Sequence, residues 1–205
     1  MAIIDRVKGI ILSPAREWDA ILSETPNTSK IITGYVLPLA LVSAAAAFIG
    51  YGLIGVNTGF FRMSGISWGL YYALNVFVSA LLSVYIGALI IDALAPSFSS
   101  EKNLPRSVQL MAYANTPALV GGILAIIPLL SFVGTLFSLY GLYLLYLGLP
   151  KLKRTPAEKQ TGYFVAALLV SIVVYLVLGA VLSKLLMPAF GVSMSMDRLP
   201  AIDIH

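Results

Sequence analysis

Long runs without a charged residue dominate the sequence. Four such stretches lie at residues 31–61, 63–91, 107–150 and 160–183. Membrane-spanning helices are expected in segments of this kind, because a charge near the middle of a bilayer is energetically costly. The third stretch holds 44 residues, enough for two spans of about 20, and Pro128 near its middle suits the turn between them.

The pattern therefore predicts an all-α protein, an integral membrane bundle of five transmembrane helices with short interfacial helices at its N-terminus. We expect the spans near residues 31–54, 67–91, 107–126, 130–149 and 162–186. Together they form one transmembrane domain over residues 31–187. Residues 188–205 then form an external C-terminal tail.

The first thirty residues follow a different pattern, because apolar and charged residues are too closely mixed there for a membrane span. Apolar residues recur at helical spacing from Ile3 to Ile11 and again from Trp18 to Leu22, with a break at Ser13-Pro14. Serine suits the cap of a helix and proline its first position. Residues 1–30 are therefore expected to form two short amphipathic helices at the membrane interface.

The distribution of lysine and arginine predicts the orientation. If the N-terminus is cytoplasmic, ten basic residues fall in the inner segments and three in the outer ones. The inner ten are Arg6, Lys8, Arg16, Lys30, Lys102, Arg106, Lys151, Lys153, Arg154 and Lys159. Cytoplasmic segments carry an excess of positive residues, so we expect a cytoplasmic N-terminus and an external C-terminus. The net charge of +4 then reflects topology, and no nucleic-acid partner is expected.

Composition narrows the chemistry. Hydrophobic residues make up 59% of the 205-residue chain and charged residues 11%, whereas a soluble domain carries roughly a quarter charged residues. The chain has no cysteine, and its single histidine is the terminal His205. A serine–histidine pair, an intramembrane aspartyl pair, a cluster of acids and a phosphate-binding glycine motif are all missing. We therefore expect no enzyme, no metal site and no cofactor.

Asp92 is the one acid close to a hydrophobic span. Facing the bundle interior, it would be a candidate proton or cation site, because intramembrane acids are costly. It follows about 25 apolar residues, however, so a tilted span would bring it to the inner headgroups. The interpretation we favour is a solvated helix end paired with Lys102 or Arg106.

The third span carries a polar stripe. Gln109, Tyr113 and Thr116 share one helical face, and Pro117 should kink the helix by freeing the carbonyl of Tyr113. With Asn115 beside them, these residues could line a substrate groove or gate in the inner half of the membrane. The simpler interpretation, which we favour, is hydrogen bonding to neighbouring spans.

Basic residues cluster after the fourth span and define a candidate cytoplasmic surface for lipids or a partner. The cluster comprises Lys151, Lys153, Arg154 and Lys159, and Trp18 of the N-terminal segment is expected on the same surface. Attraction to anionic headgroups, at about 1 kcal/mol per charge, explains such a cluster. A docking surface for a cytoplasmic protein is the alternative.

Small residues repeat every four positions in three of the spans. The repeats are Ala40/Ala44, Ser79/Ser83/Gly87 and Ala114/Ala118/Gly122. Such repeats let helices approach closely. They predict tight packing, either within one chain or between copies in a homo-oligomer.

Three short motifs resemble the bacterial branch of the Yip (Ypt-interacting protein) family. They are Leu12-Ser13-Pro14 followed by Trp18, Ile21 and Glu24; Ala112-Tyr113-Ala114-Asn115-Thr116-Pro117; and Leu139-Tyr140-Gly141-Leu142-Tyr143 with Gly148-Leu149. The likeness extends to about residue 187. It implies five transmembrane helices with a cytoplasmic N-terminus, in a bacterial inner-membrane protein.

Eukaryotic members of this family are membrane partners of Rab-type GTPases and carry an acidic Asp-Leu-Tyr-Gly-Pro element. The nearest fragment in this chain, Leu139-Tyr140-Gly141, lacks the aspartate and the proline. The resemblance therefore does not carry GTPase binding over to this chain.

Two functional hypotheses follow. The first is a non-catalytic inner-membrane protein that organises partner proteins or lipids at the cytoplasmic face. The second is a small-molecule or ion transporter or channel, with a polar path along the third span and Asp92 as an inner gate. A polar cavity that reaches the middle of the bilayer would favour transport.

Overall fold

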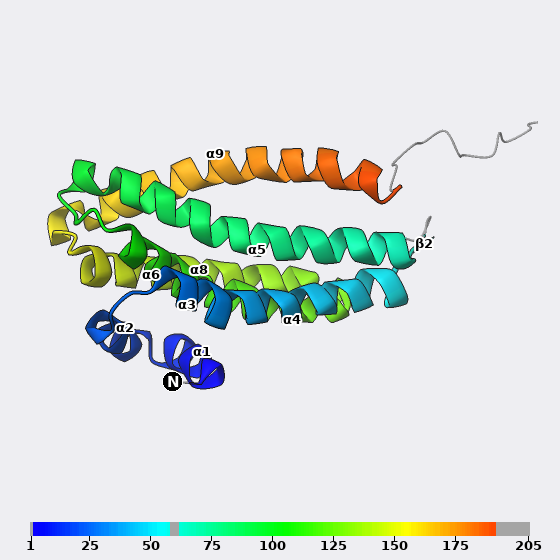
Figure 1. Cartoon of the computed structure of the whole chain (residues 1–205), viewed down its shortest axis with the longest axis horizontal. Coiled ribbons are helices and arrows are strands. Elements are labelled where there is room, and N and C mark those ends of the chain that lie inside the picture. Colours follow the sequence, from blue (N-terminus) through cyan, green and yellow to red (C-terminus); the bar gives the residue numbers. More distant parts are fainter. Residues whose placement is uncertain (1, 58–61, 192–205) are drawn as a thin grey trace, which may run out of the picture.

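The computed structural model describes residues 2–57 and 62–191, which lie mostly in helices (Figure 1). Two short helices, α1 (Ile3–Leu12) and α2 (Pro14–Ser23), come first. Helical segments long and apolar enough to span a membrane follow at Thr28–Ile54, Ile66–Phe98, Leu104–Ile126, Pro128–Lys153 and Ala157–Ala189. For the described part of the chain, the predicted all-α bundle of five membrane helices is confirmed. Most of the predicted C-terminal tail, from residue 192 onward, lies outside the described residues.

The first span is helical throughout but alternates between α-helical and π-helical segments. It consists of α3 (Thr28–Ile31), the π-helix η1 (Ile32–Val36), α4 (Leu37–Ala47) and the π-helix η2 (Phe48–Ile54). Pro38 has no N–H to donate to the carbonyl of Gly34, so regular α-helical bonding fails there and the wider turn precedes it. After the span, β1 (Val56–Asn57) pairs antiparallel with β2 (Arg62–Met63).

The remaining spans follow the predicted order. The second comprises α5 (Ile66–Leu94) and the 3-10 turn η3 (Ala95–Phe98). The third comprises α6 (Leu104–Ala114), α7 (Thr116–Gly121) and η4 (Gly122–Ile126), so the predicted interruption at Pro117 is confirmed. The fourth comprises η5 (Pro128–Leu130) and α8 (Ser131–Lys153), and the fifth is α9 (Ala157–Ala189).

Helix α5 lies at the centre of the bundle. It packs against α4, α6 and α9, while α8 packs against α6 and α7. Small residues permit these contacts: a Cβ added at Gly141 of α8 would lie 2.7 Å from the carbonyl oxygen of Ala114. Only Tyr163 and Ala167 are buried in α9, which lies along one side of the bundle (Figure 1). Most of α9 is therefore available to lipid.

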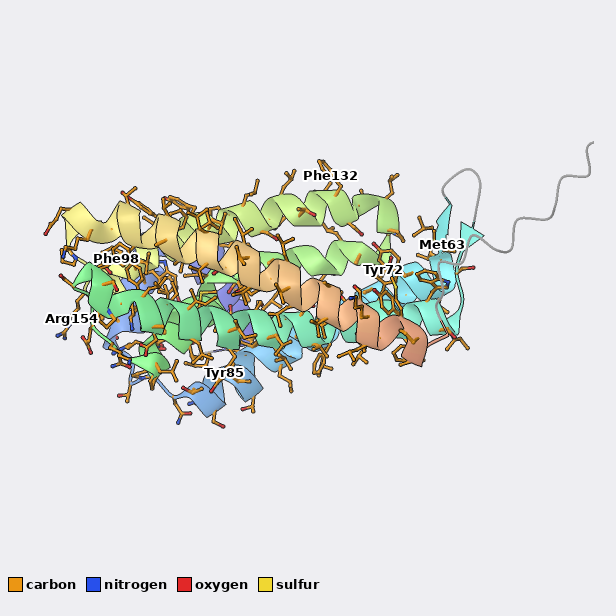
Figure 2. The ribbon with its side chains drawn as sticks, turned by 90° about the horizontal axis from the view of Figure 1, so that it is seen from above. Met63, Tyr72, Tyr85, Phe98, Phe132 and Arg154 are labelled. Carbon is orange, nitrogen blue, oxygen red and sulfur yellow. The ribbon has the colours of Figure 1, made fainter. Side chains whose placement is uncertain are left out.

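The two ends of the bundle differ in character. Figure 2 shows Phe98 and Arg154 at one end and Met63 at the other. We call the end that carries Arg154 the basic end, and α1 and α2 lie beside it (Figure 1). Helix α2 packs against α8 and α1 against α7. The N-terminal helices thus belong to the folded bundle.

Candidate functional site

Arg6 fixes the N-terminal helices to the bundle. Its side chain is only 6% exposed, and Nη1 donates to Oε1 of Glu17 over 2.6 Å, while Nη2 donates to Glu24. The guanidinium carbon lies 5.2 Å from the ring centroid of Tyr113, which places the cation over an aromatic face of the third span. One arginine therefore links α1, α2 and α6.

Trp18 is the apolar residue that anchors the N-terminal helices to the bundle. It is fully buried, and a Cβ added at Gly148 of α8 would lie 2.9 Å from its indole ring. The hydroxyl of Tyr140 on α8 donates to the carbonyl of Ile11 over 2.8 Å, which holds the end of α1. The expectation that Trp18 faces lipid or a partner is wrong, because Gly148 leaves a space that the indole fills.

Lys153 also lies inside the protein instead of on the expected basic surface. Its side chain is 0% exposed, and Nζ donates to Oδ1 of Asp92 over 3.0 Å. It also donates to Oγ of Ser107 over 2.8 Å and to the carbonyl of Asn103 over 3.2 Å. The expectation that Lys153 contacts headgroups or a partner is therefore wrong.

Asp92 has a different environment from the one we favoured. The residue is 7% exposed, and its Oδ1 also accepts from the backbone N–H of Asn103 over 2.7 Å and from Ser107 over 3.2 Å. The expected pairing with Lys102 or Arg106 is wrong, because α8 continues beyond the predicted fourth span and brings Lys153 to the carboxylate. The result is a buried ion pair that joins α5, α6 and α8.

The other three basic residues of the predicted cluster stay at the surface. Lys151 pairs with Asp19 of α2, which adds a contact to the docking of the N-terminal helices. The side chain of Arg154 is 81% exposed and lies 3.4 Å from Glu101. Lys159 donates to Oγ of Ser99 over 2.7 Å. These three cations mark the basic end, and their role toward lipid or a partner stays a prediction.

The residues of the predicted polar stripe on the third span lie in different environments. Thr116 is fully buried, and its hydroxyl lies 2.8 Å from that of Tyr35, which supports the interpretation as a contact between spans. Gln109 accepts from Nη1 of Arg106 over 2.8 Å. Gln109 and Tyr113 both line a pocket beside α1. Pro117 is buried at the start of α7.

Asn115 lines a separate groove near the middle of the spans. This mid-span groove has a volume of about 530 Å³, and its polar lining comprises Ser43, Asn75, Ser79, Ser83, Asn115, Ser138 and Tyr175. Asn115 donates to the carbonyl of Met111 over 2.9 Å, and Tyr175 donates to that of Ser83 over 2.9 Å. Asn115 therefore does not share a cavity with Gln109 and Tyr113, as a continuous polar path would require.

Sequence reasoning missed the network around Arg6 altogether. Arg6, Glu17 and Glu24 lie on two helices and the following loop, so no single helical periodicity connects them. From the sequence alone they are expected to be charges of an interfacial segment. The informative signal was the position of Arg6 next to Ile3, Val7 and Ile10, the apolar side of α1, where a charge requires a partner.

These contacts define a class of protein: a multi-pass all-α membrane protein whose N-terminal helices are fixed to one end of the bundle by buried polar contacts. The model of the Yip1 domain matches residues 8–181, and the chain belongs to this family. It is 30% identical over 180 residues to the inner membrane protein YohC of Escherichia coli K12, covering 85% of this chain and 92% of the relative.

The protein of the same name from Escherichia coli O6:H1 strain CFT073 matches with the same identity and coverage. No solved structure matches this chain. The predicted membership of the Yip family is thus confirmed, and the chain is a multi-pass inner-membrane protein. The motifs that carried the resemblance include Trp18, Tyr140 and Gly148, which dock the N-terminal helices.

Proposed function

We propose that this protein is a non-catalytic scaffold that organises lipids or partner proteins at the cytoplasmic face of the inner membrane. The observation that carries the proposal is the fixed attachment of α1 and α2 to the basic end. Arg6, Trp18 and Tyr140 hold these helices in one position relative to the spans. A surface with a fixed position at a membrane is suited to holding other molecules in place.

The exposed side of the N-terminal helices has the character of an interfacial surface. Ile4 is 65% exposed, Leu12 77% and Leu22 41%. Lys8 and Arg16 are exposed on the same two helices. Interfacial helices place apolar residues at the acyl boundary and basic residues among the headgroups. The basic residues gathered at this end support its assignment to the cytoplasmic side, where such residues are enriched.

Photo-crosslinking in intact cells tests the proposal. A photoreactive amino acid replaces Leu12 or Leu22, and the matched control replaces Leu129, which is 87% exposed at the opposite end of the bundle. We expect Leu12 and Leu22 to give specific lipid or protein adducts that differ from the bulk-lipid adducts formed at Leu129. These adducts should disappear when a Gly148→Leu substitution displaces Trp18. The same adducts at all three positions would contradict the proposal.

A second candidate function is passage of a small solute, and the mid-span groove is the observation that favours it. Asn75, Ser79 and Asn115 bring amide and hydroxyl groups to the middle of their spans, where polar groups often mark a solute path. Flux of small solutes into vesicles containing the purified protein tests this function. Asn115→Leu should abolish flux, while Thr116→Val, outside the groove, should preserve it. Equal flux in empty vesicles would refute transport of the solutes used.

A further inference from the structure

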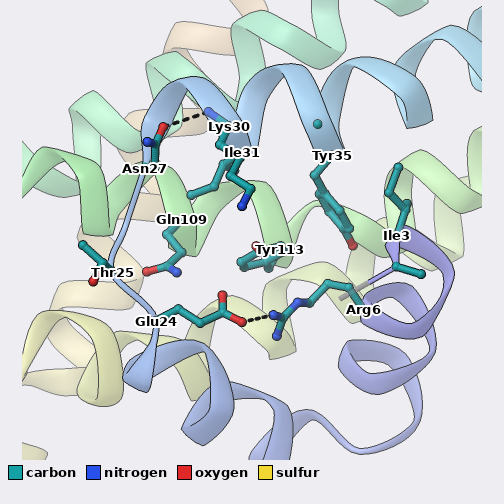
Figure 3. A pocket seen from close by; sticks show the side chains of 12 residues that line it. Ile3, Arg6, Glu24, Thr25, Asn27, Lys30, Ile31, Tyr35, Gln109 and Tyr113 are labelled. Atoms are coloured by element: carbon teal, nitrogen blue, oxygen red, sulfur yellow. Dashed lines mark hydrogen bonds and ion pairs between the residues drawn. The ribbon is translucent and has the colours of Figure 1, made fainter.

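The pocket between α1, residues 24–27, the first span and α6 has the size of a small-molecule site. Its volume is about 390 Å³, at the lower end of the range of roughly 300–1,000 Å³ for ligand pockets. Figure 3 shows Arg6 and Glu24 on one wall and Lys30 and Tyr35 on the opposite wall. Gln109 and Tyr113 of α6 also line it. We call this cavity the headgroup pocket.

The lining of the headgroup pocket carries charges of both signs. Lys30 and Arg6 are the cations in the lining, and Glu24 is the acid. Behind the lining, Glu17 pairs with Arg6, and Arg106 donates to Gln109. A ligand carrying one charge of each sign would therefore meet an opposite charge at both ends, at Lys30 and at Glu24, whereas a purely anionic ligand would also face the Glu24 carboxylate.

Several polar groups of the lining are available to a ligand. Within residues 2–57 and 62–191, the ammonium of Lys30 has no hydrogen-bond partner, and neither has the hydroxyl of Tyr113. Gln109 uses its amide oxygen toward Arg106, which leaves its NH₂ group for another acceptor. A phosphate accepts from donors of these kinds, and the Glu24 carboxylate accepts from an ammonium.

The pocket also lies at headgroup depth, on the premise that the basic end meets the membrane surface. Asn27 and Lys30, at the start of the first membrane helix, form its rim, and both are exposed. The neighbouring α1 exposes Ile4 and Leu12 to the acyl boundary. A phospholipid entering from this side could keep its acyl chains beside α1 while its headgroup occupied the pocket.

We propose that the headgroup pocket binds the zwitterionic headgroup of an aminophospholipid, a phosphate joined to a primary ammonium. Lys30, Tyr113 and Gln109 donate to the phosphate, and Glu24 accepts from the ammonium. This inference deepens the lipid part of the proposed function and rests on it. It names the lipid class that the docked N-terminal helices hold.

Native mass spectrometry of the purified protein, with equal amounts of phosphatidylethanolamine, phosphatidylcholine and phosphatidylglycerol, tests the proposal. We expect the wild type to retain phosphatidylethanolamine about tenfold more than phosphatidylcholine, which has no ammonium N–H to donate. Lys30→Gln should reduce this retention about tenfold. Lys8→Gln, an exposed charge outside the pocket, is the matched control and should leave it unchanged.

Glu24→Gln gives the sharper test, because it removes the pocket's acid and leaves net positive charge. Its lipid preference should change from phosphatidylethanolamine to phosphatidylglycerol. Trp18 fluorescence reports whether the N-terminal helices of this variant stay docked. If they undock, the proposal is decided by the wild type, through its retention of phosphatidylethanolamine relative to phosphatidylcholine. Equal retention of those two lipids, or equal effects of Lys8→Gln and Lys30→Gln, would overturn the proposal.

A soluble source of the same headgroup is tested in parallel. Glycerophosphoethanolamine has the headgroup without acyl chains, and we expect it to bind far more weakly than the lipid. Equal binding would assign the pocket to a soluble ligand and overturn the lipid proposal. Because these measurements use purified protein and defined lipids, their failure is distinguishable from the absence of crosslinked partners in cells.

Discussion

Breaking the Asp92–Lys153 ion pair should destabilise the protein far more than replacing both residues. Lys153→Met leaves the Asp92 carboxylate buried without its cation, although the N–H of Asn103 and the hydroxyl of Ser107 still donate to it. Removing one partner of a buried ion pair costs about 3–5 kcal/mol. Because two donors remain, we expect a loss of about 3 kcal/mol in the free energy of unfolding.

The double variant Asp92→Asn with Lys153→Met separates this explanation from simple loss of packing. It removes both charges, while the asparagine still accepts from the N–H of Asn103. We expect it to unfold within about 1 kcal/mol of the wild type, because a buried pair contributes little beyond its own desolvation. Lys159→Met is the surface control and should cost no more than about 0.5 kcal/mol.

Equilibrium unfolding in mixed detergent micelles measures these differences, with Trp18 emission as the signal in a Trp68→Phe background. Trp18 is fully buried in the folded protein, so its emission should shift when α2 separates from α8. If the pair behaved as an ordinary hydrogen bond between membrane helices, Lys153→Met would cost about 0.6 kcal/mol. A value that small, or a double variant as unstable as the single one, would refute the reasoning.

Three further predictions concern the docking, the third span and the topology. Gly148→Ala places a Cβ 2.4 Å from Cδ1 of Leu110 and 2.9 Å from the Trp18 ring, so it should cost about 1–3 kcal/mol and shift the Trp18 emission. Gly179→Ala, with open space around it, should do neither. Thr116→Val removes the 2.8 Å contact with Tyr35 and should cost about 0.6–2 kcal/mol, measured in a double-mutant cycle with Tyr35→Phe. Because the chain has no cysteine, Ser64→Cys should react with an impermeant maleimide in intact cells, and Ser23→Cys only after lysis. Labelling in the reverse order would contradict the proposed orientation.

The membrane fold was predictable because it depends on properties that are local in the sequence. Charge-free segments of sufficient length mark the spans, and Pro117 marks the interruption between α6 and α7. These signals need no knowledge of which helices become neighbours. Membership of the family was predictable for the same reason, because the motifs that indicate it are short and contiguous in the sequence.

The candidate sites were less predictable because they depend on contacts between distant residues. Asp92 and Lys153 are 61 positions apart. The sequence alone predicts a solvated helix end paired with Lys102 or Arg106 for Asp92, and a surface for lipids or a partner for Lys153. That expectation gives Asp92 only cations that are near in the sequence as partners, whereas in the structure α8 brings the distant Lys153 to the same buried site. The prediction for Trp18 was wrong for a related reason. An aromatic residue in an amphipathic segment suits a membrane interface as well as a buried contact, and only the structure shows that Gly148 lies opposite the indole ring.

At the N-terminal helices, polar contacts should contribute more than apolar burial to the preference for the docked over the undocked state. Undocking in water would expose Trp18, Ile10 and Ile21, which are fully buried, at roughly 1.5–3 kcal/mol each. Beside a bilayer, however, such side chains could enter the acyl region and much of that cost would disappear. Lipid phosphates could likewise replace the carboxylates around Arg6, but Glu17 and Glu24 would then be left near anionic headgroups without a cation. The two glutamates therefore favour the docked state, and with it a fixed headgroup pocket.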